Sequence, residues 1–191
     1  MSRASQVIIL CEDKLHEVFV RRFLKEYGYS ACDLHMAGYP AGGAGSGESF
    51  VRRSYPGELK AYRARSAKAT TFLIVVIDAD TSPVAHREDQ LRRACEKADV
   101  PPRQDGERVV HAIPKRAINT WLACLDGKSV DEETDYSKGP YSFRGHESDT
   151  REIIKRLHAM CLKGELPGDA PASLRHACEE FTRVKDHISR R

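Results

Sequence analysis

The stretch Thr71-Phe72-Leu73-Ile74-Val75-Val76-Ile77-Asp78-Ala79-Asp80 contains the strongest strand signal in the chain. Its first seven residues are apolar or β-branched without a break, which is typical of a strand buried on both faces of a parallel sheet. The run ends abruptly in two aspartates separated by one residue. The sequence therefore predicts a central parallel strand with acidic residues at its carboxyl end.

A second continuous apolar run, Val7–Cys11, directly precedes Glu12 and predicts another buried strand. The helical spacing of apolar residues then predicts a helix over residues 13–27, with Gly28 as its end. A weaker strand is expected around residues 31–36.

The glycine-rich stretch from Gly38 to Gly47 predicts a loop, and it contains no P-loop pattern for cradling phosphates. A basic helix is expected over residues 48–68, interrupted near Pro56-Gly57. The next helix is expected to begin with Ser82 as its cap and Pro83 in its first turn, and to run to about Ala98.

The last part of the chain predicts a short strand at residues 108–113 and a helix opened by Pro114. A long polar loop over residues 126–147 and helices over residues 149–162 and 171–187 follow. Alternation of strands and helices predicts an α/β fold with a four-stranded parallel sheet flanked by helices and a C-terminal helical extension. We expect a catalytic core in residues 1–125, with residues 126–191 packed on the same domain.

Length and composition favour one globular domain. The chain has 191 residues, of which 40% are hydrophobic and 31% charged, with a net charge of +3. No apolar run approaches the roughly 20 residues that cross a bilayer, and no signal peptide is visible at the N-terminus. We therefore expect a cytoplasmic protein without a membrane partner.

The six cysteines form no CxxC pair, so a zinc ribbon is not predicted. Most lie in apolar or helical stretches, which favours reduced, buried thiols. His158, Cys161, His176 and Cys178 offer the ligand types of a zinc site, but ordinary helix positions are the preferred interpretation.

Two acidic clusters follow strands that could be neighbours. Glu12 follows the first strand, and Asp78 and Asp80 follow the third. In an open parallel sheet, sites form at the carboxyl ends of the strands, and clustered carboxylates repel one another unless a cation is present. Mg²⁺ (or Mn²⁺) held by Glu12, Asp78 and Asp80 is the predicted cofactor, and phosphoryl transfer or hydrolysis is the predicted chemistry. The simpler alternative is that these acids only end strands and cap helices. For His16 and Glu17, surface exposure is favoured over a place in the site.

The motif Leu10-Cys11-Glu12-Asp13 together with Ile77-Asp78-Ala79-Asp80 resembles the Toprim family, whose signature is a glutamate after the first strand and DxD after the third. The segment from Ile113 to Leu125 resembles small stand-alone Toprim proteins similar to the nuclease half of the OLD family. The resemblance covers roughly residues 6–125. It implies a Toprim-like parallel sheet, with Glu12 as general base or metal ligand and Asp78 and Asp80 as Mg²⁺ ligands. It also implies nuclease activity, an ABC- or AAA-type ATPase as partner, assembly into an oligomer or complex, and a role in anti-phage defence.

The chain departs from the family pattern at three positions. Asp13 stands where many members have glycine, His16 where many have an acid, and Asn119 where a glutamate is expected. Asn119 retains a carbonyl oxygen for a metal. These departures suit an alternative function, a catalytically silent Toprim-like subunit that binds a partner.

Basic residues provide candidate contacts to phosphates. Lys115 and Arg116 follow a strand that should end near the acids, so Lys115 is a candidate catalytic residue and Arg116 a candidate substrate-binding residue. Arg52 and Arg53 begin the most basic stretch of the chain and are further candidates for substrate binding. A solvated helix face is the alternative for that stretch. Trp121 is expected in the core.

Rival uses of the DxD motif are a phosphotransferase of the HAD class and a glycosyltransferase. In the former, the motif normally opens the chain, whereas here it follows the third strand. No other feature of the sequence points to a sugar nucleotide. DNA and RNA both remain open as the substrate.

Overall fold

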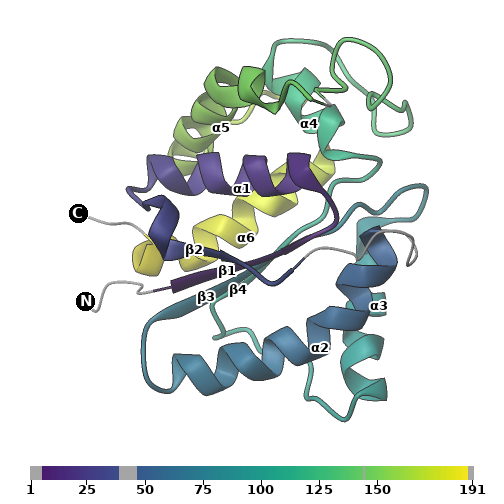
Figure 1. Cartoon of the computed structure of the whole chain (residues 1–191). Helices are drawn as coiled ribbons and strands as arrows, with labels where there is room; N and C mark the ends of the chain where they lie inside the picture. Colours follow the sequence, from purple (N-terminus) through teal and green to yellow (C-terminus); the bar gives the residue numbers. More distant parts are fainter. Residues whose placement is uncertain (1–5, 39–46, 144, 189–191) are drawn as a thin grey trace.

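The computed structural model describes residues 6–38, 47–143 and 145–188. Four strands and six α-helices alternate over most of the chain (Figure 1). Their bounds, in chain order, are β1 Gln6–Cys11, α1 Lys14–Glu26, β2 Leu34–Met36, α2 Gly47–Ser66, β3 Thr71–Val76, α3 Val84–Lys97, β4 Val109–Ala112, α4 Ile118–Leu125, α5 Arg151–Lys163 and α6 Ala172–Ile188.

The four strands form one parallel sheet in the order β2-β1-β3-β4. The predicted α/β class and four-stranded parallel sheet are thus confirmed. β1 and β3 pair along their whole length, with Cys11 opposite Val76. All six residues of β3 are buried, as its continuous apolar run predicts. This order places the carboxyl ends of β1 and β3 side by side at the centre of the sheet.

The sheet separates two apolar cores. Alternate strand residues such as Val7 and Ile9 face a core built with α1, α4, α5 and α6, whereas Ile8 and Leu10 face a core built with α2 and α3. Figure 1 shows α1, α4 and α5 on one side of the strands and α2 and α3 on the other. Helices on both faces explain why the strand sequences are apolar throughout.

α2 is one continuous helix, so the predicted interruption near Pro56 is wrong. A proline inside a helix removes one hydrogen bond and typically costs about 3 kcal/mol. On this helix Val51, Tyr55 and Leu59 are buried against the sheet, and Pro56 is buried as well. Burial of that face offsets the local cost.

Other element boundaries also differ from the predictions. α4 begins at Ile118 rather than at Pro114, because the Pro114 carbonyl accepts a hydrogen bond from Ala79 N (2.7 Å) and holds this segment beside the end of β3. Pro83, not Ser82, occupies the cap position of α3. Only Leu34–Met36 of the weak strand is extended, since a 3₁₀ turn takes Ala31–Asp33.

The C-terminal helices pack on the first core. Phe181 of α6 contacts Phe23 of α1, with ring centroids 4.5 Å apart. Trp121 is fully buried, as predicted, and its Nε1 donates to Ser173 Oγ (2.8 Å). α5 and α6 thus share a core with the sheet.

The expectation of reduced thiols is wrong for one pair of cysteines. Cys161 of α5 and Cys178 of α6 form a disulfide, because the two helices pack together and bring their Cα atoms to 5.3 Å. The zinc alternative fails with it. His158 packs edge-on against Tyr27, and His176 lies 3.3 Å from a Glu88 carboxylate oxygen instead.

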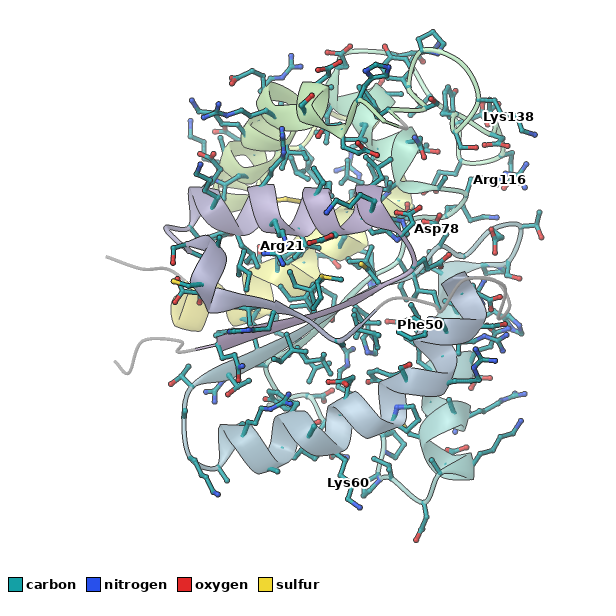
Figure 2. All side chains as sticks on the ribbon, in the orientation of Figure 1. Arg21, Phe50, Lys60, Asp78, Arg116 and Lys138 are labelled. Atoms are coloured by element: carbon teal, nitrogen blue, oxygen red, sulfur yellow. A yellow bond between two sulfur atoms is a disulfide. The ribbon has the colours of Figure 1, made fainter. Side chains whose placement is uncertain are left out.

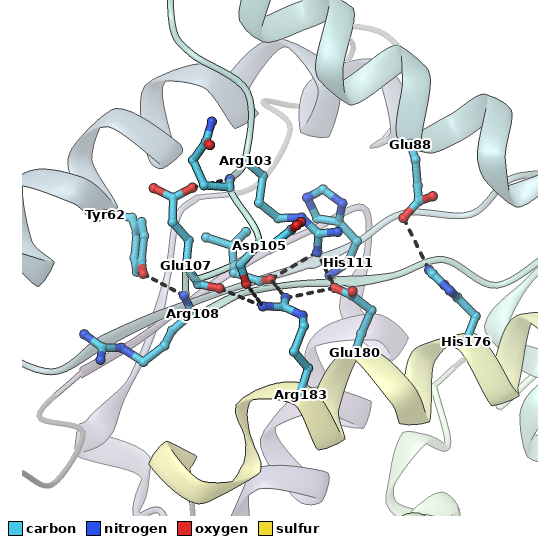
Figure 3. A network of polar contacts seen from close by, with 12 residues as sticks. Tyr62, Glu88, Arg103, Asp105, Glu107, Arg108, His111, His176, Glu180 and Arg183 are labelled. Carbon is cyan, nitrogen blue, oxygen red and sulfur yellow. Dashed lines mark hydrogen bonds and ion pairs between the residues drawn. The ribbon is translucent and has the colours of Figure 1, made fainter. Parts of the chain in front are cut away.

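A buried polar network fastens α6 to β4 (Figure 3). The Glu180 carboxylate accepts hydrogen bonds from the His111 backbone N–H (3.0 Å), from Arg103 and from Arg183 (3.3 Å). His111 Nε2 lies 2.9 Å from Tyr55 Oη on the α2 side. The network therefore links both faces of the sheet through β4.

In the part of the chain that the structure describes, no helix combines the length and the apolar character needed to cross a membrane.

Candidate functional site

Two of the predicted site residues meet at the carboxyl edge of the sheet. Glu12 follows β1 and Asp78 comes two residues after β3. The backbone N–H of Asp78 donates to Glu12 Oε1 (2.7 Å). Because β1 and β3 are hydrogen-bonded neighbours, their ends hold these two carboxylates together although 66 residues separate them.

Asp80 completes the acidic edge from a left-handed backbone conformation, with φ of 54°. Aspartate tolerates this region better than most residues other than glycine. Its side chain is 63% exposed, and Oδ2 lies 3.2 Å from Arg87 Nη2. Arg87 is buried in the first turn of α3 and also binds Glu48 of α2. One guanidinium thus connects the DxD turn to two helices.

His16 is buried beside Asp78, so its predicted exposure is wrong. Its Nε2 lies 3.1 Å from Asp78 Oδ1, and its side chain is only 1% exposed. α1 aims it there because Asp13 caps the helix, accepting a hydrogen bond from His16 N through its side chain (2.9 Å). His16 thus places a basic group against Asp78.

Charges at this edge are strongly coupled. Burial, with repulsion from Asp78, raises the pKa of Glu12 to about 8. Burial also raises the pKa of Asp78, and His16 opposes that shift. Burial alone would lower the pKa of His16, but the charge and hydrogen bond of Asp78 raise it to about 10. The edge is therefore a place where negative charge is costly and a cation is stabilised.

Lys115 lies beside the acidic turn. Its Nζ donates to the Thr81 carbonyl (3.3 Å) and lies 3.3 Å from a Glu133 carboxylate oxygen, with 16% of the side chain exposed. Arg116 is partly exposed, and Figure 2 shows it on the same side of the molecule as Asp78. Both predicted basic residues thus belong to the edge where the carboxylates gather.

Arg52 and Arg53 lie farther along α2. Arg52 Nε is 2.6 Å from a Glu48 carboxylate oxygen, and Arg53 is exposed. Arg52 is connected to the acidic turn through Glu48 and Arg87.

α2 starts directly on top of Glu12. A Cβ atom placed on Gly47 would come within 2.8 Å of both the Glu12 Cβ and the Glu12 carbonyl oxygen. Any other residue at position 47 would therefore push α2 and Glu12 apart, and glycine is required for this close approach.

Two residues weighed from the sequence are engaged elsewhere. Glu17 is buried, contrary to its predicted exposure, and binds Lys14 (2.7 Å) and Arg21 (2.5 Å). Asn119 is buried, and its Nδ2 donates to the carbonyl oxygens of Tyr141 and Ser142, which fastens the 126–147 segment to α4.

The acids offer the oxygen ligands that Mg²⁺ prefers. Glu12 Oε2 and Asp78 Oδ2 accept no hydrogen bond from any described residue. Among the described residues, no three His, Cys, Asp or Glu side chains lie close enough together to hold a metal ion. At this edge the Asp80 carboxylate is directed toward Arg87 instead. Mg²⁺ is usually bound by one or two carboxylates with substrate phosphates and waters. Glu12 and Asp78 could supply those one or two carboxylates.

Sequence reasoning missed Arg87 and Glu48, and set His16 aside. Arg87 and Glu48 are charged residues on amphipathic helices, where solvent exposure is the ordinary expectation. The one signal available was for His16, since it stands where the Toprim pattern that the sequence resembles has an acid.

Comparison with protein-family models, curated proteins and solved structures gave no match. The structure defines the class of fold, an α/β domain with a four-stranded parallel sheet and an acidic turn at its carboxyl edge. The Toprim and OLD-like resemblance, the ATPase partner, the assembly into a complex and the role in anti-phage defence stay predictions.

Proposed function

We propose that this protein is a Mg²⁺-dependent hydrolase of nucleic-acid phosphodiesters, a nuclease of Toprim-like type. One observation carries the proposal: the hydrogen bond from the Asp78 backbone N to Glu12 Oε1, which fixes the Glu12 carboxylate beside Asp78 at the carboxyl edge of the two central strands. Sites of open parallel sheets form at this edge.

Glu12 and Asp78, with Asp80 close by, would hold the ion. When bound, it neutralises charge on the phosphodiester and lowers the pKa of a water. Glu12 supplies a carboxyl group that exchanges a proton close to neutral pH, because burial and Asp78 raise its pKa to about 8. The Lys115 ammonium group, oriented by the Thr81 carbonyl and by Glu133, stabilises negative charge developing on the phosphate oxygens.

A second candidate function is nucleic-acid binding without cleavage. The observation that favours it is the pairing of Asp78 with His16 and of Asp80 with Arg87. These basic side chains already offset part of the negative charge that a metal would neutralise. In that case the site would bind a partner or a strand without hydrolysing it.

The test is metal binding and cleavage measured in parallel. Mg²⁺ and Mn²⁺ are titrated into the purified protein, and cleavage is assayed on plasmid, single-stranded DNA and total tRNA. Wild-type protein is expected to bind metal and cleave at least one substrate, and Glu12→Gln and Asp78→Asn to lose both properties. Glu26→Gln, an exposed acid at the far end of α1, is the matched control and should behave as wild type.

Each alternative has its own outcome. Nucleic-acid binding with no metal binding and no cleavage supports the non-catalytic function. Cleavage that survives in both Glu12→Gln and Asp78→Asn overturns the proposed site.

A further inference from the structure

A groove of about 580 Å³ runs between α2 and α3, next to the acidic edge. It is open to solvent. Its lining residues are Ser49, Arg52, Arg53, Pro56, His86, Gln90, Arg93, Ala94, Lys97 and Ala98.

The groove is strongly basic. Three arginines and one lysine line it, together with His86, and no acidic residue does. Beside the groove, Glu48 pairs with Arg52 and Arg87, and Asp80 also pairs with Arg87. In the same way Asp89 pairs with Arg92 and Arg93, and Glu96 also pairs with Arg92. These four acids balance four arginines, and Arg53 and Lys97 of the lining add two positive charges, so the groove attracts anions.

The lining selects the kind of anion. It contains no Phe, Tyr or Trp ring on which a base could stack, and its apolar atoms come from one proline and two alanines. Pockets for small organic ligands are mostly apolar and aromatic, and base-reading surfaces use stacking platforms. Arginine and lysine without such platforms suit phosphates, which are contacted independently of base sequence.

The groove is continuous with the acidic edge. Its first lining residues, Ser49 and His86, are the chain neighbours of Glu48 and Arg87, and Arg87 binds Asp80. At the same end, Gly47 rests on Glu12. A chain of phosphates lying in the groove would thus reach the carboxylates at one end.

We propose that the α2–α3 groove holds the sugar-phosphate backbone of a nucleic-acid strand and leads it to Glu12 and Asp78. The class of ligand rests on the proposed function. The chemistry recognised is a run of phosphodiesters, which DNA and RNA share. Arg53 and Lys97, one from each helix, contact phosphates, and the groove carries no base preference.

The test measures binding without cleavage. Fluorescence anisotropy follows labelled single-stranded DNA, RNA of the same sequence and duplex DNA, in EDTA and in Ca²⁺, across a range of salt concentrations. The groove variant is Arg53→Gln/Lys97→Gln. The control is Lys60→Gln/Lys68→Gln, which removes the same charge from exposed positions near the far end of α2 and just after it; Figure 2 shows Lys60 away from Asp78.

The groove variant is expected to bind more weakly for all sequences, with a salt slope about 2 smaller in magnitude, one for each lost phosphate contact. The control should keep the wild-type slope, because its two lysines lie outside the groove. If the slope depended on net charge alone, it would change equally in both variants. The polymer with the largest loss identifies the ligand as single-stranded DNA, RNA or duplex. Circular dichroism checks that both variants fold.

Three results overturn the proposal: no binding by wild-type protein in either buffer, equal slopes in the two variants, or displacement by polyglutamate as effective as by nucleic acid. Failure of the proposed function looks different. If binding depends on the groove but no cleavage occurs in Mg²⁺ or Mn²⁺, the groove proposal stands and the nuclease proposal fails. If cleavage occurs and is unaffected in the Arg53→Gln/Lys97→Gln variant, the nuclease proposal stands and the groove proposal fails.

Discussion

His16 Nε2 lies 3.1 Å from Asp78 Oδ1, and both side chains are largely buried at the end of β3. The contact joins the first helix to the acidic turn. It also places a basic group beside a carboxylate of the acidic turn. The stability of the site and its chemistry therefore depend on the same pair.

Removing one member of this pair should destabilise the protein more than removing both. Asp78→Ala leaves the His16 imidazole buried without its partner, and breaking a buried pair in this way costs on the order of 3 kcal/mol. The double variant His16→Leu/Asp78→Ala should recover part of that loss. Urea unfolding of the four proteins in the cycle measures it, and strictly additive free energies would show that the pair is not coupled.

Gly47→Ala should displace α2 from Glu12. The added Cβ would lie 2.8 Å from Glu12 atoms, so we expect a loss of about 1–3 kcal/mol in the free energy of unfolding, together with weakened metal binding. Gly57→Ala is the control on the same helix, since a Cβ there meets no atom within 4 Å. It should stabilise by roughly 0.5–1 kcal/mol through helix propensity. Equal thermal shifts in the two variants would contradict the close approach.

Lys115→Ala should slow cleavage by about 10²-fold or more if Lys115 stabilises charge in the transition state. Arg53→Ala should instead weaken binding and leave the single-turnover rate at saturating protein near wild type. Single-turnover cleavage at several protein concentrations separates the two effects. If Arg53→Ala lowered the single-turnover rate more than Lys115→Ala did, the catalytic site would lie near α2 and not at the acidic turn.

Mild acid should destabilise the protein through His111. Burial, with the positive charge of Arg103, lowers the pKa of His111 to about 3, against roughly 6.5 in an unfolded chain. Between these values the unfolded state binds the extra proton, so stability is full above about pH 6.5 and falls as the pH drops. The expected loss from pH 7 to pH 5 is about 2 kcal/mol.

His111→Gln can keep a hydrogen bond to Tyr55 but does not titrate, so it isolates this contribution. Its unfolding free energy should change less between pH 7 and pH 5 than that of the wild type. Parallel curves for the two proteins would show that the pKa of His111 is the same in the folded and unfolded states.

The disulfide predicts a simple thiol count. Of the six cysteines, the structure leaves four as free thiols. Thiol titration in denaturant should therefore give four without reductant and six after reduction. Cys161→Ser/Cys178→Ser should lower stability by about 3 kcal/mol, because the bridge closes a loop between residues 17 apart. Six reactive thiols in the unreduced protein would exclude the bridge.

The strands were predictable because burial on both faces requires apolar runs, and β3 carries the longest such run before the DxD turn. Helix boundaries were less so. The break expected at Pro56 follows from the helix-breaking tendency of proline, but the buried contacts of α2 keep the helix continuous. The helix start expected at Pro114 follows from the preference of proline for the first turn, but the Ala79–Pro114 hydrogen bond holds this residue outside the helix.

At the site, the meeting of Glu12 and Asp78 followed from strand order alone. The partners of the acids did not, because His16 and Arg87 reach them through the docking angles of α1 and α3, which no spacing in the sequence encodes. For the same reason the Glu180 network and the disulfide had no visible signature.

The contact between Gly47 and Glu12 has a mechanical consequence. α2 is an unbroken helix of 20 residues, a rod about 30 Å long. A tilt of only about 2° around its far end, where Arg63 is paired with Glu107, moves its first turn by about 1 Å for a rod of this length. Since that turn lies against Glu12, a small rotation of α2 is expected to shift the position of the Glu12 carboxylate.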